Sequence, residues 1–182
     1  MSKSTEELKN EHGTIVRMLR VMSKASDNLM NDKEVDPKLW RDVSEFLRDF
    51  VDRCHHGKEE NYLFPTMMER GVSGEVGLIE VLLREHDDGR AHAKRLRALV
   101  ARKQDSSIRN GISKTVRAYV DLLTMHIKKE NGVLFPLADE LLTPEDQREL
   151  EAGFEKIETE VIGPGVHARY ERMIEDWTAR YG

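Results

Sequence analysis

Apolar residues recur at every third or fourth position along most of this chain, which is the spacing of amphipathic α-helices that bury one face. The pattern predicts four long helices, which start at a capping box at residues 4–7, at Asp36-Pro37, at about residue 75 and, after a turn at residues 103–107, at about residue 108. Pro65 and Pro136 should kink or end the second and fourth helices, because a proline ring displaces the backbone four residues earlier.

A helical appendage is expected after the fourth helix. Thr143-Pro144 marks a helix start, with a capping residue followed by proline, and residues 163–165 (Gly-Pro-Gly) separate that helix from a last amphipathic one. No stretch is long enough to act as a flexible linker between domains. We therefore expect a single domain over residues 1–182, with a four-helix core at about 5–142 and an appendage at about 143–182.

One motif occurs twice. Residues 55–65 read HHGKEENYLFP and residues 126–136 read HIKKENGVLFP, so that His126 follows His55, and Glu130 follows Glu59, by the same 71 residues. The second copy has no counterpart of His56, so the register pairs His55 with Glu59 rather than His56 with Glu60. A His and a Glu four residues apart lie on one helix face, about one turn apart. Each pair can therefore reach the same metal ion or two adjacent ones.

Each copy is preceded by a Glu-His dipeptide. Glu11-His12 lies 43 residues before His55 (55 − 12), and Glu85-His86 lies 40 residues before His126 (126 − 86). The repeated unit is a pair of helices, and its duplication predicts an all-α fold, an antiparallel up-down four-helix bundle with additional C-terminal helices.

Composition excludes several classes of protein. Among 182 residues, 35% are charged and 38% hydrophobic, with a net charge of −5, so neither a disordered chain nor a nucleic-acid-binding protein is indicated. The polar N-terminus does not resemble a signal peptide, and no stretch reaches the ~18 apolar residues of a membrane span. A single cysteine agrees with a cytoplasmic location.

The repeated positions supply four imidazoles and two carboxylates. Two facing His-Glu pairs would hold two metal ions, because a carboxylate can bridge two ions through its two oxygens. The set suits iron or manganese, although zinc or copper would also bind such ligands. A lone helical histidine is more often a packing or surface residue, but two copies in one register favour a metal site. The candidate ligands are His12, His55, Glu59, His86, His126 and Glu130.

Other side chains are candidates for an additional ligand or for contacts around the site. His56 should lie close to the ligands or on the surface. Glu60, four residues later in the same motif, is a further candidate for a contact around the site. His167 shares a helical stripe with apolar residues and should point toward the bundle, as a further ligand or as a buried residue bonded to the backbone. Tyr62 and Tyr119 should lie on the face of the site, either as core residues or as hydrogen-bond donors to a bound oxygen species.

The motifs resemble those of hemerythrin-like domains, which are described by a His-His-Glu cation-binding motif, over residues 5–142. The resemblance implies two irons joined by an oxo or hydroxo bridge, with manganese or zinc as substitutes. It implies that Glu59 and Glu130 bridge the irons, that His12 and His55 serve one, and that His86 and His126 serve the other.

One departure concerns the third helix. Oxygen-carrying hemerythrins have His-x-x-x-His there, whereas the second position here is Arg90. The set of four His and two Glu is similar to that of the C-terminal domains of iron-centre repair proteins. These features favour an oxidoreductase that consumes peroxide or nitric oxide, or a protein that protects against oxidative or nitrosative stress. Reversible binding, storage or sensing of oxygen or nitric oxide, and an iron-responsive interaction module, are the alternatives.

Overall fold

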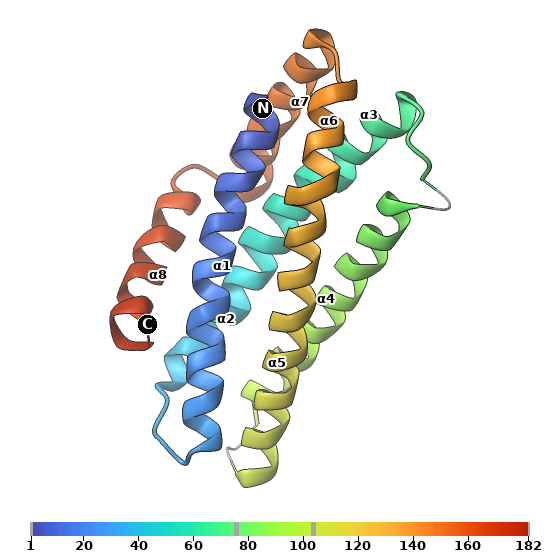
Figure 1. Ribbon diagram of the computed structural model, residues 1–182. Coiled ribbons are helices and arrows are strands. Elements are labelled where there is room, and N and C mark those ends of the chain that lie inside the picture. Colours follow the sequence, from blue (N-terminus) through green and yellow to red (C-terminus); the bar gives the residue numbers. More distant parts are fainter. Residues whose placement is uncertain (1, 75–76, 103–104, 182) are drawn as a thin grey trace.

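The computed structural model describes residues 2–74, 77–102 and 105–181, and four long helical segments lie side by side in up-down order (Figure 1). The predicted all-α bundle is confirmed. The expected helix start at Glu75, and Lys103 and Gln104 of the expected turn, lie outside the described residues. The four segments are α1 (Lys3–Met30); α2 (Pro37–Phe46), η1 (Leu47–His56), η2 (Glu59–Leu63) and α3 (Phe64–Glu69); α4 (Leu78–Val100); and α5 (Ser106–Lys129), η3 (Glu130–Leu134) and α6 (Phe135–Leu141).

The C-terminal helices cover one side of the bundle, as Figure 1 shows. They are α7 (Pro144–Lys156), η4 (Ile157–Ile162) and α8 (Val166–Tyr181). α8 contacts α1 and α2, η4 contacts η1, and α7 contacts α1 and η2. Thr143 caps α7 in a capping box, and Gly163, with φ of 93°, ends η4 where glycine is favoured. None of the described helices combines the length and the apolar character needed to cross a membrane.

The predicted cap of α1 was wrong by two residues. Ser2, not Ser4, is the N-cap, and its side chain accepts a hydrogen bond from the Thr5 N–H. Ser4 and Thr5 are buried within the helix, where Ser4 contacts Gln147 and the Thr5 hydroxyl donates to Asp139 (2.8 Å). Contacts with α6 and α7 therefore fix this end of the bundle. The cap at Asp36 agrees with the sequence, but α5 begins at Ser106, slightly earlier than expected.

Pro65 and Pro136 end neither helix. Each follows a short π-helical stretch, η2 or η3, in which hydrogen bonds span five residues instead of four. The Phe64 N–H donates to the Glu59 carbonyl, and the Phe135 N–H donates to the Glu130 carbonyl. The wider turn accommodates the proline ring, so both helices continue. Each of these stretches begins with a glutamate of the repeated motif.

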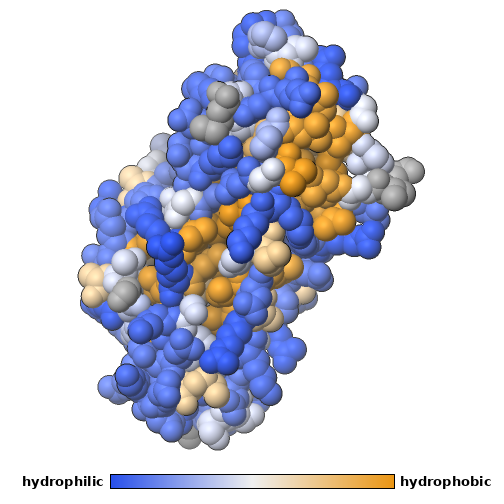
Figure 2. All heavy atoms as spheres, in the orientation of Figure 1, coloured by the Kyte–Doolittle hydropathy of each residue, from blue (hydrophilic) through white to orange (hydrophobic). Residues whose placement is uncertain are grey.

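Two hydrophobic clusters fill the bundle and leave a polar layer between them. One extends from the layer toward Met22 and Trp40, and the other extends toward Phe135 and Phe154. On α1, for example, Leu8 belongs to the second cluster and Ile15 to the first, with His12 between them. Figure 2 shows the exterior of one face, where polar residues predominate and hydrophobic ones show through between the helices. The buried polar layer is where the repeated motifs meet.

Candidate metal centre

The six side chains predicted from the repeat meet in this layer. All six are buried, with exposed fractions between 0% and 2%. They form two groups, in each of which the ligating atoms lie within 4.8 Å of one another, and the two carboxylates belong to both groups. The first group is His12, His55, Glu59 and Glu130, and the second is Glu59, His86, His126 and Glu130.

The imidazoles approach one another in pairs through their Nε2 atoms. His12 Nε2 lies 2.9 Å from His55 Nε2, and His86 Nε2 lies 3.1 Å from His126 Nε2. Two nitrogen lone pairs turned toward the same point are a geometry that a cation can bind. The pairing is the one that the resemblance implied, one pair from each half of the repeat.

Each carboxylate faces both pairs. Glu59 Oε1 lies 3.7 Å from His55 Nε2, and Glu59 Oε2 lies 3.4 Å from His86 Nε2. Glu130 Oε2 lies 3.1 Å from one histidine of each of the same pairs. Glu59 is therefore placed to donate one oxygen to each of two cations, and Glu130 lies against both histidine pairs through Oε2.

The surroundings of the carboxylate oxygens indicate whether metal ions fit between these side chains. None of the four oxygens of Glu59 and Glu130 makes a hydrogen bond to the described part of the chain, although all are inaccessible to solvent. Buried carboxylates are costly unless they are paired or bind metal ions. The nearby imidazoles supply part of that pairing and hold the pKa of Glu130 well below its ordinary value, although burial alone would raise it. Cations between the carboxylates and the imidazoles satisfy both sets of atoms.

The outer nitrogens of the histidines are also bonded. His55 Nδ1 donates to Glu11 Oε2 (2.8 Å), and the buried ammonium of Lys58 donates to Glu11 Oε1 (2.6 Å). Burial opposes ionisation of Glu11, but the hydrogen bond and charge of His55, with those of Lys58, lower its pKa to about 2. Such carboxylates fix the ring and leave Nε2 free to bind a metal. The second copy repeats this arrangement with Glu85, His126 and Lys129.

The two remaining histidines are held from the opposite half of the repeat. His86 Nδ1 donates to Glu60 Oε1 (2.6 Å), and His12 Nδ1 donates to Asn131 Oδ1 (3.0 Å). Glu60 and Asn131 occupy the same position in the two copies of the motif. Burial lowers the basicity of His86, but the adjacent carboxylates of Glu59 and Glu60 raise its pKa to about 9.

Arg90 holds Glu60 in turn. Its guanidinium donates to Glu60 Oε1 (2.6 Å), Asp52 Oδ1 (2.7 Å) and Asp87 Oδ1 (3.0 Å). The charge of Arg90 is balanced by these carboxylates. Its contact with the site runs through Glu60 to His86.

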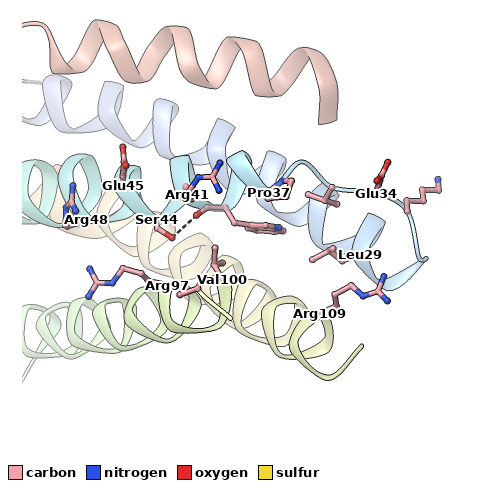
Figure 3. Close-up of a pocket in the computed structure, with 14 residues that line it drawn as sticks. Leu29, Glu34, Pro37, Arg41, Ser44, Glu45, Arg48, Arg97, Val100 and Arg109 are labelled. Atoms are coloured by element: carbon pink, nitrogen blue, oxygen red, sulfur yellow. Dashed lines mark hydrogen bonds between the residues drawn. The ribbon is translucent and has the colours of Figure 1, made fainter. Parts of the chain in front are cut away.

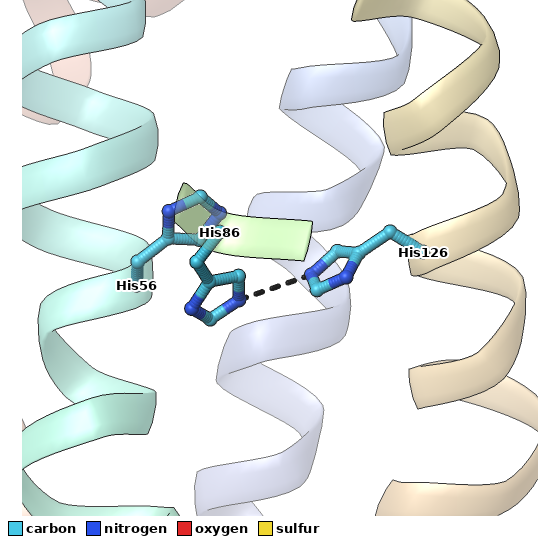
Figure 4. Close-up of side chains that lie close together, drawn as sticks. All are labelled: His56, His86 and His126. Carbon is cyan, nitrogen blue, oxygen red and sulfur yellow. Dashed lines mark hydrogen bonds between the residues drawn. The ribbon is translucent and has the colours of Figure 1, made fainter. Parts of the chain in front are cut away.

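His56 is not a surface residue. It is 2% exposed, its ring stacks on His86 with centroids 3.7 Å apart and planes inclined by 11°, and neither ring nitrogen has a hydrogen-bond partner in the described part of the chain. Figure 4 shows it beside the pair of His86 and His126. Burial lowers the pKa of His56 well below its ordinary value, with the neighbouring histidines adding to the effect. Tyr119 is buried as expected and lines the same small cavity as His56.

Tyr62 does not reach the site. Its ring packs against Gly153 and lies 6.5 Å from the ring of Phe154 on α7. Our expectation assumed α-helical spacing from Glu59, whereas the intervening residues are π-helical, so that the direction of Tyr62 changes.

His167 lies outside both ligand groups. Its Nε2 is 3.4 Å from Cys54 Sγ and 3.7 Å from Glu11 Oε1, and its side chain is 36% exposed. Because α8 packs on the outside of the bundle, His167 approaches the site through the Glu11 carboxylate, which also bonds His55. In this arrangement His167 lies near the carboxylate that orients His55 and not among the candidate metal ligands.

Sequence reasoning missed the residues that orient the histidines. They stand at repeated positions of the motif, but we assigned roles only to the repeated residues that were expected to bind metals. They are Glu11, Glu85, Lys58 and Asn131. The sequence offered two signals that we did not use. A Glu precedes both His12 and His86, and a Lys precedes both Glu59 and Glu130.

Comparisons with known proteins agree with this geometry. The family model of the hemerythrin HHE cation binding domain matches residues 3–138. Uncharacterized proteins of Mycobacterium tuberculosis (Rv1995) and Mycobacterium bovis (Mb2018) are each 25% identical over 160 residues, which cover 87% of this chain. The match spans 62% of the length of these curated relatives. No solved structure matches the chain significantly. The chain thus belongs to the hemerythrin HHE cation-binding domain family.

Proposed function

We propose that this protein is a non-haem di-iron protein that engages oxygen, nitric oxide or peroxide, and that it consumes peroxide or nitric oxide rather than carrying oxygen reversibly. The observation that carries the proposal is the position of Glu59. Its two oxygens face histidines of different pairs, at 3.7 and 3.4 Å, and neither has a hydrogen-bond partner in the described part of the chain. A single-ion site would leave one of these oxygens without a cation.

The ligand chemistry favours iron or manganese. Imidazole nitrogens and carboxylate oxygens are ligands for both metals, and the described residues place no thiolate in either ligand group. Manganese and zinc remain the expected substitutes. Bound iron would supply Lewis acidity and the capacity to change oxidation state.

The preference for turnover rests on the balance between the two groups. Each contains two histidines and the same two glutamates. Arg90 is committed to Glu60 and Asp52, and His167 lies outside both groups, so neither adds a ligand to one side. Two equivalent positions open to an exogenous ligand are suited to a molecule that spans the pair, whereas an oxygen carrier needs one protected position.

The chain's own residues support this by holding the site dry and fixed. Hydrophobic clusters above and below exclude water, and each histidine of the two pairs has a defined tautomer because its Nδ1 donates to a specific oxygen. Preorganised ligands reduce the rearrangement needed during a reaction.

The test is metal analysis followed by reaction of the reduced protein. Protein from iron-supplied cells should contain two irons per chain, and a single iron at full occupancy would reject the dinuclear proposal. Oxygen is then added to the reduced protein. Rapid irreversible oxidation, with catalytic consumption of peroxide or nitric oxide, supports turnover. A long-lived oxygenated spectrum that disappears under vacuum would instead establish reversible carriage.

A further inference from the structure

We propose that the cavity between η1 and α4 is the route by which small ligands reach the metal centre, that His56 is its inner gate, and that its basic mouth favours anions. This inference rests on the proposed function, since it concerns access to the same site. The cavity has a volume of about 160 Å³, and its wall includes His56, Asp52, Gly89, Arg90 and Tyr119. That is room for a few atoms, not for a large substrate.

His56 is the strongest reason to place the route here. A buried imidazole with two unbonded nitrogens is unusual, because buried polar groups nearly always find a partner. The ring lines the cavity on one side and stacks on His86 on the other. Its rotation would break no hydrogen bond to the described part of the chain. A ligand that passes or displaces it gains a hydrogen-bond donor close to the metal ligands.

His56 is not a ligand of the ion held by His86 in this arrangement. Its nitrogens are near those of His86 and His126, but the His56 and His86 rings are almost parallel, inclined by 11°. A metal ion lies close to the plane of each imidazole that binds it, and two stacked, nearly parallel rings with centroids 3.7 Å apart do not direct their nitrogens at one ion. The stack therefore fits a gate better than a fifth ligand.

The glycine at position 89 keeps the cavity open. A Cβ there would lie 3.7 Å from Leu123 Cδ2 and 3.8 Å from Tyr119 Cε2, which is ordinary contact. An alanine therefore fits without strain, whereas a longer side chain would extend into the space between Tyr119 and His56. Gly89→Ala and Gly89→Leu therefore form a pair of substitutions that differ in how far the new side chain fills the route.

The outer end of the route is positively charged. The cavity shares Ser44, Arg48 and Arg97 with a larger surface pocket of about 680 Å³ at the end of the bundle (Figure 3). Arg90 is paired with carboxylates, but Lys94 and Arg97 have no ion pair within the described residues and are exposed. Unpaired cations beside a narrow entrance raise the local concentration of anions and their rate of entry.

The decisive experiment measures azide binding to the iron-loaded protein by stopped-flow absorbance, with nitric oxide as a neutral probe. Gly89→Leu should slow the association of both at least tenfold, while Gly89→Ala, the matched control, stays near wild type. Both variants must retain wild-type iron content and thermal stability. If folded, loaded Gly89→Leu associates as fast as Gly89→Ala, the proposed route is overturned.

The charged mouth gives an independent measurement that does not depend on tolerance at position 89. Lys94→Glu/Arg97→Glu should slow azide association severalfold and remove its dependence on salt, yet leave nitric oxide unaffected. Arg20→Glu/Lys114→Glu makes the same change in net charge at exposed positions elsewhere and should change little. Equal effects of the two double variants would overturn the role of the mouth.

His56→Phe separates a gate from a ligand. Phenylalanine preserves the stack on His86 but cannot donate a hydrogen bond, so azide affinity should fall about tenfold, mainly through faster dissociation, while iron content stays at wild type. Loss of one iron would make His56 a ligand and overturn the gate. A wild-type protein that takes up no iron would instead reject the proposed function itself, independently of any variant.

Discussion

Glu60 Oε1 lies 2.6 Å from His86 Nδ1, although the two residues belong to different halves of the repeat. Glu59, the preceding residue, directs its carboxylate into the centre of the bundle, within 3.4 Å of the opposite nitrogen of the same imidazole. Two adjacent glutamates thus face the two nitrogens of one histidine. Their chemical roles differ because only Glu59 is also close to the other pair of histidines.

Glu59→Gln and Glu60→Gln should therefore behave differently. The first removes the charge that faces both cations and should reduce the iron content well below two per chain. The second should leave both sites in place and weaken binding by about 10 to 100 fold, as changes in residues that orient metal ligands do. Titration of the metal-free variants with ferrous iron under anaerobic conditions measures both the number of irons bound per chain and the affinity. Equal losses would show that our assignment of the bridging residue is wrong.

The two lysines of the motif should differ in their effect on stability. Lys58 is 0% exposed and bonds the carboxylates of Glu7, Glu11 and Glu158, whereas Lys129 is 32% exposed beside Glu85. Lys58→Met leaves the buried carboxylate of Glu11 without its ammonium partner and should cost about 3–5 kcal/mol, while Lys129→Met should cost about 1 kcal/mol or less. Urea unfolding of the metal-free proteins provides the comparison, and similar losses would contradict it.

Gly153 should be intolerant of a side chain because Tyr62 lies on it. A Cβ at position 153 would collide with the Tyr62 ring, so Gly153→Ala should destabilise the protein by about 1–3 kcal/mol. Gly13 is the matched control, since it also lies within a helix but has no atom within 4 Å of an added Cβ. Gly13→Ala should stabilise by up to about 1 kcal/mol. In a double-mutant cycle, Tyr62→Ala should relieve most of the loss at Gly153, and additive effects would contradict the contact.

Stability and metal affinity should change with pH in opposite directions. The pKa of His86 rises from 6.5 to about 9 through its carboxylate partners, and the pKa values of His12 and His126 are also raised. A raised pKa stabilises the folded metal-free protein fully below pH 6.5, and that contribution is lost as pH rises through about 9. Metal binding requires the neutral imidazole, so affinity should increase over the same range.

Urea unfolding of the metal-free protein at pH 6.5 and pH 9 tests the first part, with lower stability expected at the higher pH. Metal titration in a weakly buffered solution tests the second, through the protons released as the histidines bind. Metal-free protein that is more stable at pH 9 than at pH 6.5 would contradict the direction.

The sequence by itself determined the fold class and the set of side chains that meet. Helical periodicity places His55 and Glu59 on one face whatever the helix packs against, and the exact repeat carries the same geometry to His126 and Glu130. The Asp36 and Thr143 caps were also evident, because capping is a local interaction. These features depend only on residues a few positions apart.

Only the tertiary structure decided the surroundings of the site. The π-helical turn after Glu59 directs Tyr62 toward Gly153, which belongs to the separate helix α7. The burial of His56 against His86 and the bond between Glu60 and His86 depend on the relative position of separate helices. His167 stays outside because α8 packs on the outside of the bundle. Spacing along one helix determines the direction in which a side chain points. The residue that it contacts there depends on how the separate helices pack.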